Sequence, residues 1–179
     1  MKHLLFLLLL SLSLVFTGCD VNDSLFPESE SESDLKSAEL KMVPIKGEIQ
    51  SHVTAYQDGV PVQGILSGNM THLGQLIAEK SIFNTTSLTL DEATWTISWE
   101  MSGATCAANG DLMYYNLSGT FNIPANELIA HIEIENGTGR FKNAVGYVEA
   151  SGYADDPMAI TTMYMHCEGL ISNVGSGKY

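Results

Sequence analysis

The chain has 179 residues, the size of one domain, and its 21 acidic side chains outnumber 8 Lys and Arg for a formal net charge of −13. This acidity excludes a nucleic-acid-binding role, because phosphate backbones are bound by Lys and Arg. It also repels an anionic membrane surface, so attachment to a membrane would need another device.

The N-terminal segment has the pattern of an export signal. Lys2 precedes an apolar run that begins at Leu4 and continues through Phe16 with only two serines. The run is shorter than the roughly 20 residues of a membrane-spanning helix. We therefore expect residues 1–18 to be a cleaved signal peptide.

The signal ends in residues 16–19 (FTGC), which resemble the lipobox of bacterial lipoproteins, with Phe16 where an aliphatic residue is usual. The resemblance implies that Cys19 is diacylated on its thiol and begins the mature chain; the alternative is simple cleavage by a secretory peptidase. Loss of Lys2 with the signal changes the formal charge from −13 to −14. A multiply acylated cysteine is held stably by a bilayer. We expect a lipoprotein of the bacterial cell envelope, with the membrane as its partner through Cys19.

Residues 19–44 are expected to form a disordered acidic tether. Ser, Asp and Glu dominate this segment, most densely in residues 28–34 (ESESESD). Such a composition cannot bury enough apolar surface to offset its ordering entropy, and a calcium site on so flexible a chain would be weak. The acids from Asp20 onward resemble the sorting signals of Bacteroidetes-type lipoproteins. The resemblance does not settle the membrane leaflet; the outer membrane is the expected location.

Residues 45–179 read as a domain of short strands. Apolar and polar residues alternate in residues 49–55, 95–101, 113–121 and 128–135, the period of a half-buried strand. Turn residues such as Asp58-Gly59 and Asn109-Gly110 separate these runs. Residues 73–80 are the nearest candidate for a helix, but a strand is the preferred interpretation.

About eight strands are expected, which suits a closed antiparallel up-and-down β-barrel with no exposed sheet edge. A β-sandwich is the alternative. Small residues at Gly119, Gly146, Ala150 and Gly152 fit close approach of strands in a barrel.

Three motifs in order carry a family resemblance: residues 70–74 (MTHLG), 107–111 (AANGD) and 137–141 (GTGRF) followed by Ala144. This order resembles a group of small bacterial secreted proteins, and the last motif is similar to one shared by plant dirigent proteins and allene oxide cyclases. The resemblance runs from about Lys46 to the C-terminus. It implies an eight-stranded barrel around an apolar cavity. The residues that define it are His72, Gly74, Asn109, Gly110, Asp111, Gly137, Thr138, Gly139, Arg140, Phe141 and Gly146.

The third motif is interpreted as a mark of the fold. Gly137 and Gly139 permit a tight turn, and Asn136 stands where the family has glycine, as the other residue that tolerates a left-handed backbone. Phe141 is expected to plug one end of the barrel. Arg140, the only arginine, is expected to pair with Asp111 and lock two turns together; the alternative is a clamp for a ligand carboxylate.

Two cysteines remain after Cys19, namely Cys106 and Cys167. In an exported protein an even pair is most simply interpreted as a disulfide, and two separate buried thiols are the alternative.

The sequence has no nucleophile elbow, phosphate loop or zinc signature, and its histidines lack metal-ligand spacing. No cofactor or metal is expected. The preferred function is a lipid-anchored barrel that binds a small apolar ligand or serves as a structural module. The alternatives are a cyclase- or isomerase-like enzyme using the same cavity, and an oligomeric interaction module, a trimer by analogy with the plant relatives. Residues that could line a cavity, or equally form a filled core, are Trp95, Trp99, Met113, Tyr115, Met163 and Met165.

Overall fold

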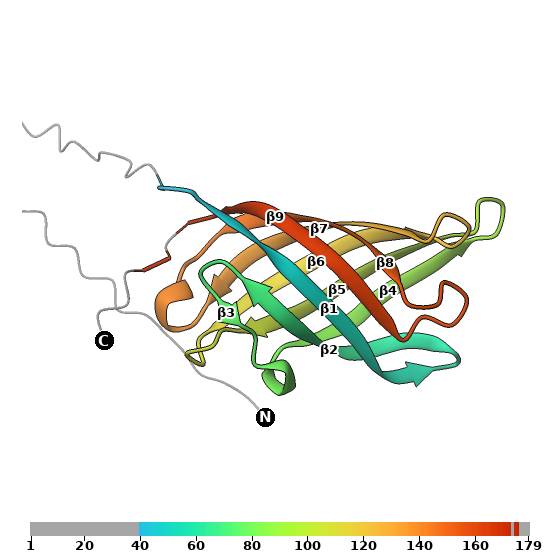
Figure 1. Ribbon diagram of the computed structural model, residues 1–179, viewed down its shortest axis with the longest axis horizontal. Helices are drawn as coiled ribbons and strands as arrows, with labels where there is room; N and C mark the ends of the chain where they lie inside the picture. Colours follow the sequence, from blue (N-terminus) through green and yellow to red (C-terminus); the bar gives the residue numbers. More distant parts are fainter. Residues whose placement is uncertain (1–39, 173, 176–179) are drawn as a thin grey trace, which may run out of the picture. The chain divides into compact units, whose positions relative to one another are not determined.

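The computed structural model describes residues 40–172, 174 and 175, which form an all-β domain (Figure 1). The expected signal peptide, Cys19 and most of the acidic tether lie outside the described residues. The strands are β1 (Val43–Gln57), β2 (Val60–Met70), β3 (Gly74–Gln75), β4 (Ile82–Asp91), β5 (Thr96–Cys106), β6 (Leu112–Asn122), β7 (Glu127–Gly137), β8 (Gly146–Ala154) and β9 (Thr162–Ile171). Two 3-10 turns, η1 (Ala78–Lys80) and η2 (Gly139–Phe141), interrupt them.

The sheet closes on itself as an eight-stranded antiparallel barrel. Its strand order is β1-β9-β8-β7-β6-β5-β4-β2, and β1 also pairs with β2, so that each strand pairs with its predecessor and successor among the eight. The first and last strands lie side by side in Figure 1, in register from Val43 with Ile171 to His52 with Thr162. This closure confirms the expected barrel and excludes the sandwich.

One joint of the barrel is short. β2 and β4 pair only from Gln63 with Asn84 to Ile65 with Ile82. Beyond this joint, β2 pairs instead with the two-residue β3, which stands outside the eight-stranded ring. The preferred interpretation of residues 73–80 as a full strand was therefore wrong: the segment contains only β3 and η1. Its apolar Leu73 and Leu76 are drawn inward, with exposed fractions of 0% and 4%.

The small residues expected to allow close approach of strands do so. A Cβ built at Gly146 would lie 2.2 Å from the carbonyl oxygen of Leu170 on β9. One built at Gly119 would lie 2.8 Å from Nε1 of Trp99, across the β5–β6 pair. Glycine at position 119 therefore makes room for the indole ring inside the barrel.

The two ends of the barrel differ. β1 and β9 begin and end at one extremity, together with residues 71–81, 107–111 and 138–145, and we call this the closed end. The hairpin turns 58–59, 92–95 and 123–126 and the loop 155–161 lie at the other, which we call the open end. The closed end is filled by fully buried side chains, namely Ile45, Leu73, Ala107, Phe141, Ala144 and Ile171.

The first strand, β1, begins at Val43, and the domain was expected from residue 45. Trp95 does not continue the inward row of β5; it lies in the β4–β5 turn with a positive φ of 53° and is 49% exposed. The alternation of apolar and polar residues, which was predicted to start at Trp95, therefore starts with β5 at Thr96.

Candidate functional site

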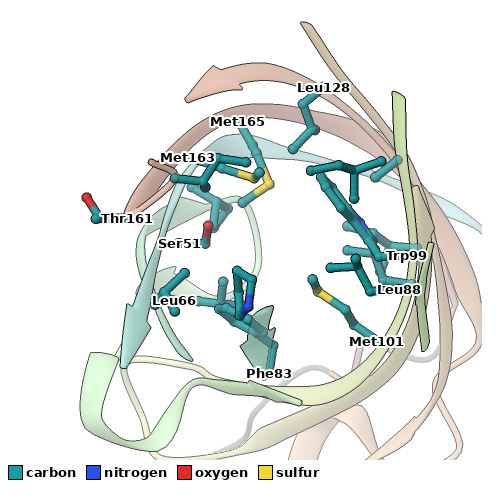
Figure 2. A pocket seen from close by; sticks show the side chains of 18 of the residues that line it. Ser51, Leu66, Phe83, Leu88, Trp99, Met101, Leu128, Thr161, Met163 and Met165 are labelled. Atoms are coloured by element: carbon teal, nitrogen blue, oxygen red, sulfur yellow. The ribbon is translucent and has the colours of Figure 1, made fainter. Parts of the chain in front are cut away.

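The centre and open half of the barrel enclose an apolar cavity of about 400 Å³. Inward-facing side chains from every strand of the ring line it, and Figure 2 shows several of them converging from opposite walls. The wall residues include Ile49, Leu66, Phe83, Leu88, Trp99, Met101, Met113, Tyr115, Leu128, Met163 and Met165. Five of the six residues expected to line a cavity or a core thus line a cavity, the exception being Trp95.

A few polar groups interrupt this apolar wall. Ser51 and Thr105 are 8% and 5% exposed and both line the cavity. The hydroxyl of Tyr115 donates a hydrogen bond of 3.3 Å to the carbonyl oxygen of Ile82, and Cys167 contributes its thiol. Ser51 and Thr105 have hydroxyls that stay neutral at any physiological pH.

Two buried ionisable groups of the wall, Tyr115 and Cys167, are held in their protonated form. Burial raises the pKa of Tyr115 above its usual value. Burial, and secondarily the charge of Glu48, raises the pKa of Cys167 to about 12. Among the described residues that line the cavity there is no Asp, Glu, His, Lys or Arg. The wall therefore presents neutral hydrogen-bonding groups to an occupant, and no charge.

The open end supplies the mouth of the cavity. The loop 155–161 lines it with Met158 and Ile160, and Met158 is 72% exposed. The Tyr56 hydroxyl ties this loop to β1 by donating a 2.9 Å hydrogen bond to the carbonyl oxygen of Ile160. The mouth is thus built from apolar side chains on a loop that is fastened to the barrel wall.

Asp155 organises the mouth loop. Its Oδ2 accepts a 2.6 Å hydrogen bond from the Thr161 hydroxyl, and its Oδ1 accepts bonds from the backbone amides of Asp156 and Thr162. These bonds, that of Thr161 first, lower the pKa of Asp155 to about 2. The carboxylate stays ionised in any neutral medium and holds the two ends of the loop together.

The three sequence motifs meet at the closed end, away from the mouth. The amide of Ala108 donates to the carbonyl oxygen of Leu73 at 2.9 Å, which joins the first and second motifs. The amide of Leu112 donates to the Thr138 hydroxyl at 2.8 Å, and the amide of Thr138 donates to the Leu112 carbonyl oxygen at 2.8 Å, which joins the second motif to the third. His72, at a positive φ of 67°, shares a 3.0 Å hydrogen bond between Nε2 and the Pro44 carbonyl oxygen. The motifs therefore close the barrel.

Asp111 is the centre of this closure, but it does not pair with Arg140 as expected. Its Oδ2 accepts a 3.1 Å hydrogen bond from the Arg140 backbone amide and a 2.7 Å bond from Nδ2 of Asn109. These two bonds, that of Arg140 first, lower the pKa of Asp111. Gly139 makes the approach feasible: it has a φ of 52°, and a Cβ there would lie 2.0 Å from Oδ1 of Asp111.

The Arg140 side chain has a different place. Its guanidinium carbon lies 4.9 Å from the centre of the Phe141 ring, and its buried Nε has no hydrogen-bond partner among the described residues. Arg140 is not among the residues that line the cavity. The prediction that Asp111 pairs with Arg140 was therefore right about the two residues and wrong about the group, because the backbone amide of Arg140, and not its guanidinium, binds the carboxylate. The position does not support the alternative of a clamp for a ligand carboxylate in the cavity.

Asn136 does not adopt the left-handed backbone expected at its position, whereas Phe141 fills one end of the barrel as expected. Oδ1 of Asn136 accepts hydrogen bonds from the amides of Gly137 and Asn143, at 2.8 and 2.9 Å. Asn136 therefore bridges the start and the end of the turn. Phe141 is fully buried in the filled closed end.

The expected disulfide is not formed. Cys106 and Cys167 are both free and buried. They stand on β5 and β9, which are not neighbours in the ring, so the two thiols belong to different walls of the barrel. The alternative of two separate buried thiols is the one that the structure shows.

Two histidines on the outer face, His131 and His166, pair with carboxylates. Nδ1 of His131 lies 2.7 Å from Oε1 of Glu149, and Nδ1 of His166 lies 2.6 Å from Oε1 of Glu48. The hydrogen bond to Glu48 raises the pKa of His166. Within residues 40–172, 174 and 175, no group of three or more His, Cys, Asp or Glu side chains could hold a metal ion.

Charge is divided between the two ends of the barrel. The described Lys and Arg residues all lie on closed-end segments: Lys41, Lys46, Lys80, Arg140 and Lys142. The open-end segments carry only acidic charges among the described residues, at Asp58, Asp91, Glu92, Glu127, Asp155 and Asp156. An anionic ligand would therefore approach the mouth against a negative field.

Comparisons with known proteins bear on the fold alone. No family model and no curated protein matches the chain. Two solved structures are similar to it, both described as pterocarpan synthase dirigent proteins. One, PsPTS1, is 12% identical over 74% of this chain and 96% of its own, with a TM-score of 0.42. The other, GePTS1, is 15% identical over 83% of this chain and 99% of its own, with a TM-score of 0.43. Similarity at this level supports no statement about activity, and the barrel rests on the strand pairing itself.

The described part of the chain contains no helix long and apolar enough to cross a membrane.

Proposed function

We propose that this protein is an exported, lipid-anchored β-barrel that binds a small, neutral, apolar ligand. The observation that carries the proposal is the apolar cavity of about 400 Å³ with its mouth at the open end. An eight-stranded barrel either fills its interior with side chains or holds one small ligand. In this barrel, side chains fill the closed end, and the cavity in the remainder has room for one small ligand.

The size and lining of the cavity support ligand binding. Small-molecule pockets occupy about 300–1,000 Å³ and are mostly apolar with a few placed polar groups. Protein interiors are otherwise packed as densely as organic crystals, and an empty apolar space forfeits dispersion contacts along its whole lining. An apolar occupant would restore those contacts and stabilise the barrel.

Binding is preferred over catalysis because of the chemistry of the wall. A general acid or base works best with a pKa near the operating pH. Tyr115 and Cys167, the ionisable groups buried in the wall, have raised pKa values instead. The enzyme alternative would therefore have to act by confining and orienting a reactive ligand, as the resemblance to allene oxide cyclases and dirigent proteins suggests.

The proposed anchor is compatible with an accessible mouth. The described chain enters the barrel at the closed end, where β1 begins at Val43. A lipid on Cys19, followed by an acidic tether, would hold the barrel by the end that carries Lys41, Lys46 and Lys80. The mouth lies at the opposite end of the barrel. Incorporation of labelled palmitate by the full chain, abolished by Cys19→Ala, would test the anchor separately from ligand binding.

Native mass spectrometry of the mature chain carrying Cys19→Ser tests the binding function and the oligomeric alternative together. We expect a species heavier than the polypeptide by one small molecule, which is lost on denaturation. Exposure of the protein to N-phenyl-1-naphthylamine, a neutral apolar probe, should give a complex of one probe per chain. A protein that neither retains a small molecule nor takes up the probe would contradict the proposal. A homotrimer without either would favour an interaction module.

A further inference from the structure

The cavity wall contains a buried hydroxyl that has no hydrogen-bond partner among the described residues. Thr105 is 5% exposed, and its Oγ1 is buried without any hydrogen-bond partner among the described residues. The residue lines the cavity. A buried hydroxyl left unpaired in this way is destabilising relative to a paired one. Such groups are rare in native proteins and call for a specific explanation.

Thr105 lies at the inner end of the cavity. β5 runs from the open end to the closed end, and Thr105 is its last residue but one, opposite Met113 on β6. Next to it, Cys106 fixes the backbone by donating a 2.9 Å hydrogen bond to the Ser81 hydroxyl. Ser81 is itself fully buried and donates to the Ile77 carbonyl oxygen. The Cys106 amide and the Ser81 hydroxyl thus have partners, whereas the hydroxyl of Thr105, a residue of the cavity wall, has none among the described residues.

We propose that Thr105 receives a neutral hydroxyl or carbonyl group at the inner end of an otherwise apolar ligand. This inference rests on the proposed function and narrows it to a class of ligand: an apolar skeleton with one uncharged oxygen at its leading end. A hydroxyl side chain can donate to a carbonyl and can either donate to or accept from an alcohol. Ser51, whose hydroxyl Figure 2 shows projecting from the β1 wall, is a second neutral partner along the cavity.

The charges of the barrel argue against a carboxylate in the same position. The described residues of the wall include no cation, and burying an unpaired carboxylate is far more costly than burying a hydroxyl. The acidic side chains of the open end, among them Asp58 and Asp156, would oppose its entry. Alcohols and ketones are therefore expected to bind better than fatty-acid-like anions of the same skeleton.

Competition by three molecules of one skeleton tests the inference: naphthalene, 2-naphthol and 2-naphthoate, each displacing N-phenyl-1-naphthylamine from the mature Cys19→Ser chain. We expect 2-naphthol to bind about fivefold more tightly than naphthalene, as one additional hydrogen bond implies, and 2-naphthoate to bind most weakly. Thr105→Val keeps the shape and removes the hydroxyl. It should abolish the advantage of 2-naphthol and leave the affinity for naphthalene unchanged.

Thr85→Val is the matched control. Oγ1 of Thr85 is also buried and without a partner among the described residues, but Thr85 is not part of the cavity wall. This variant should leave the affinities for all three molecules unchanged. In the ligand-free protein Thr105→Val should raise the melting temperature, because it removes an unpaired buried hydroxyl.

The outcomes separate this inference from the proposed function. If neither the probe nor naphthalene binds, the binding function itself fails. If naphthalene binds and 2-naphthol gains nothing over it in the native chain, or keeps its gain in Thr105→Val, the role of Thr105 is refuted. A fall in melting temperature of ligand-free Thr105→Val would also refute it, since the hydroxyl would then have a partner within the protein.

Discussion

Gly139→Ala tests the closure of the barrel end most sharply. Gly139 adopts a φ of 52°, and a Cβ at this position would lie 2.0 Å from Oδ1 of Asp111. A residue with a side chain costs about 1–2 kcal/mol in this left-handed region. The new Cβ also displaces the Asp111 carboxylate from the Arg140 amide. A hydrogen bond to a charged group contributes about 1.5–3 kcal/mol when buried, and we discount it to about 1 kcal/mol because Asp111 is solvated.

The two terms predict a loss of about 2–3 kcal/mol in the free energy of unfolding. For a domain of this size, 1 kcal/mol shifts the melting temperature by about 3–4 °C, so the melting temperature should fall by about 6–12 °C. Differential scanning calorimetry and chemical denaturation of the mature Cys19→Ser chain would measure the effect.

Gly110→Ala provides the control. Gly110 has a φ of 90°, but a Cβ there would have no neighbour within 4 Å. Gly110→Ala should therefore lower the free energy of unfolding only by the backbone contribution of about 1–2 kcal/mol. Combining Gly139→Ala with Asp111→Ala should cost less than the sum of the two single changes, because both remove the same hydrogen bond. Equal losses for the two glycine variants, or strictly additive losses in the double variant, would refute the reasoning.

Three further predictions concern the cavity and its surroundings. Met165→Trp should fill the cavity and weaken binding of N-phenyl-1-naphthylamine at least about tenfold, since Met165 projects into the cavity (Figure 2). The control is Ile129→Trp, at a position 55% exposed on the outer face, which should leave binding unchanged. Equal affinities in the two variants would show that the probe binds elsewhere. Asp155 has a folded-state pKa of about 2 against an ordinary 3.8, so its stabilisation is complete above about pH 5 and is lost as the pH falls toward 2. Between pH 5 and 2 the melting temperature should therefore fall less steeply for Asp155→Ala than for the native chain. Parallel dependences of melting temperature on pH would contradict the role of Asp155. Thiol titration of the unreduced Cys19→Ser chain should find two reactive thiols after denaturation and almost none before it, because Cys106 and Cys167 are free and buried. Fewer than two reactive thiols after denaturation would show that a disulfide forms.

The architecture was accessible from sequence because the strands that face a barrel interior repeat with period two. Alternation in residues 49–55 and 113–121 marked inward and outward positions, and Asp58-Gly59 and Asn109-Gly110 marked turns between strands. The three motifs were predicted to mark the fold, and the structure brings them together at the closed end. Their convergence on one end could not be read from their spacing, since it depends on pairing between strands distant in the chain.

The errors have local physical causes. In residues 73–80 the apolar spacing reflects Leu73 and Leu76 packing into the closed end from an irregular segment. The sequence suggested the charged side chain of Arg140 as the partner of Asp111, whereas Gly139 lets the Arg140 backbone amide reach the Asp111 carboxylate. Trp95 continued the alternation of β5 by chance, although its position in the turn requires a positive φ.

The cavity itself was beyond sequence reasoning. The same inward row of large apolar side chains is expected for a filled core and for a ligand pocket. Whether space remains depends on how those side chains pack across the barrel. Thr105 illustrates the limit, since its hydroxyl is distinguished only by the absence of a partner among the described residues.

The most direct test of the central claim, that the barrel holds an apolar ligand, uses its own tryptophan as the reporter. The chain has two tryptophans, and Trp95→Phe leaves Trp99, which lies in the cavity wall, as the only one. Titration of this variant of the mature Cys19→Ser chain with N-phenyl-1-naphthylamine should quench Trp99 emission by energy transfer, saturate at one probe per chain, and reverse on addition of 2-naphthol. A titration that does not saturate, or probe fluorescence that rises without quenching of Trp99, would contradict the claim.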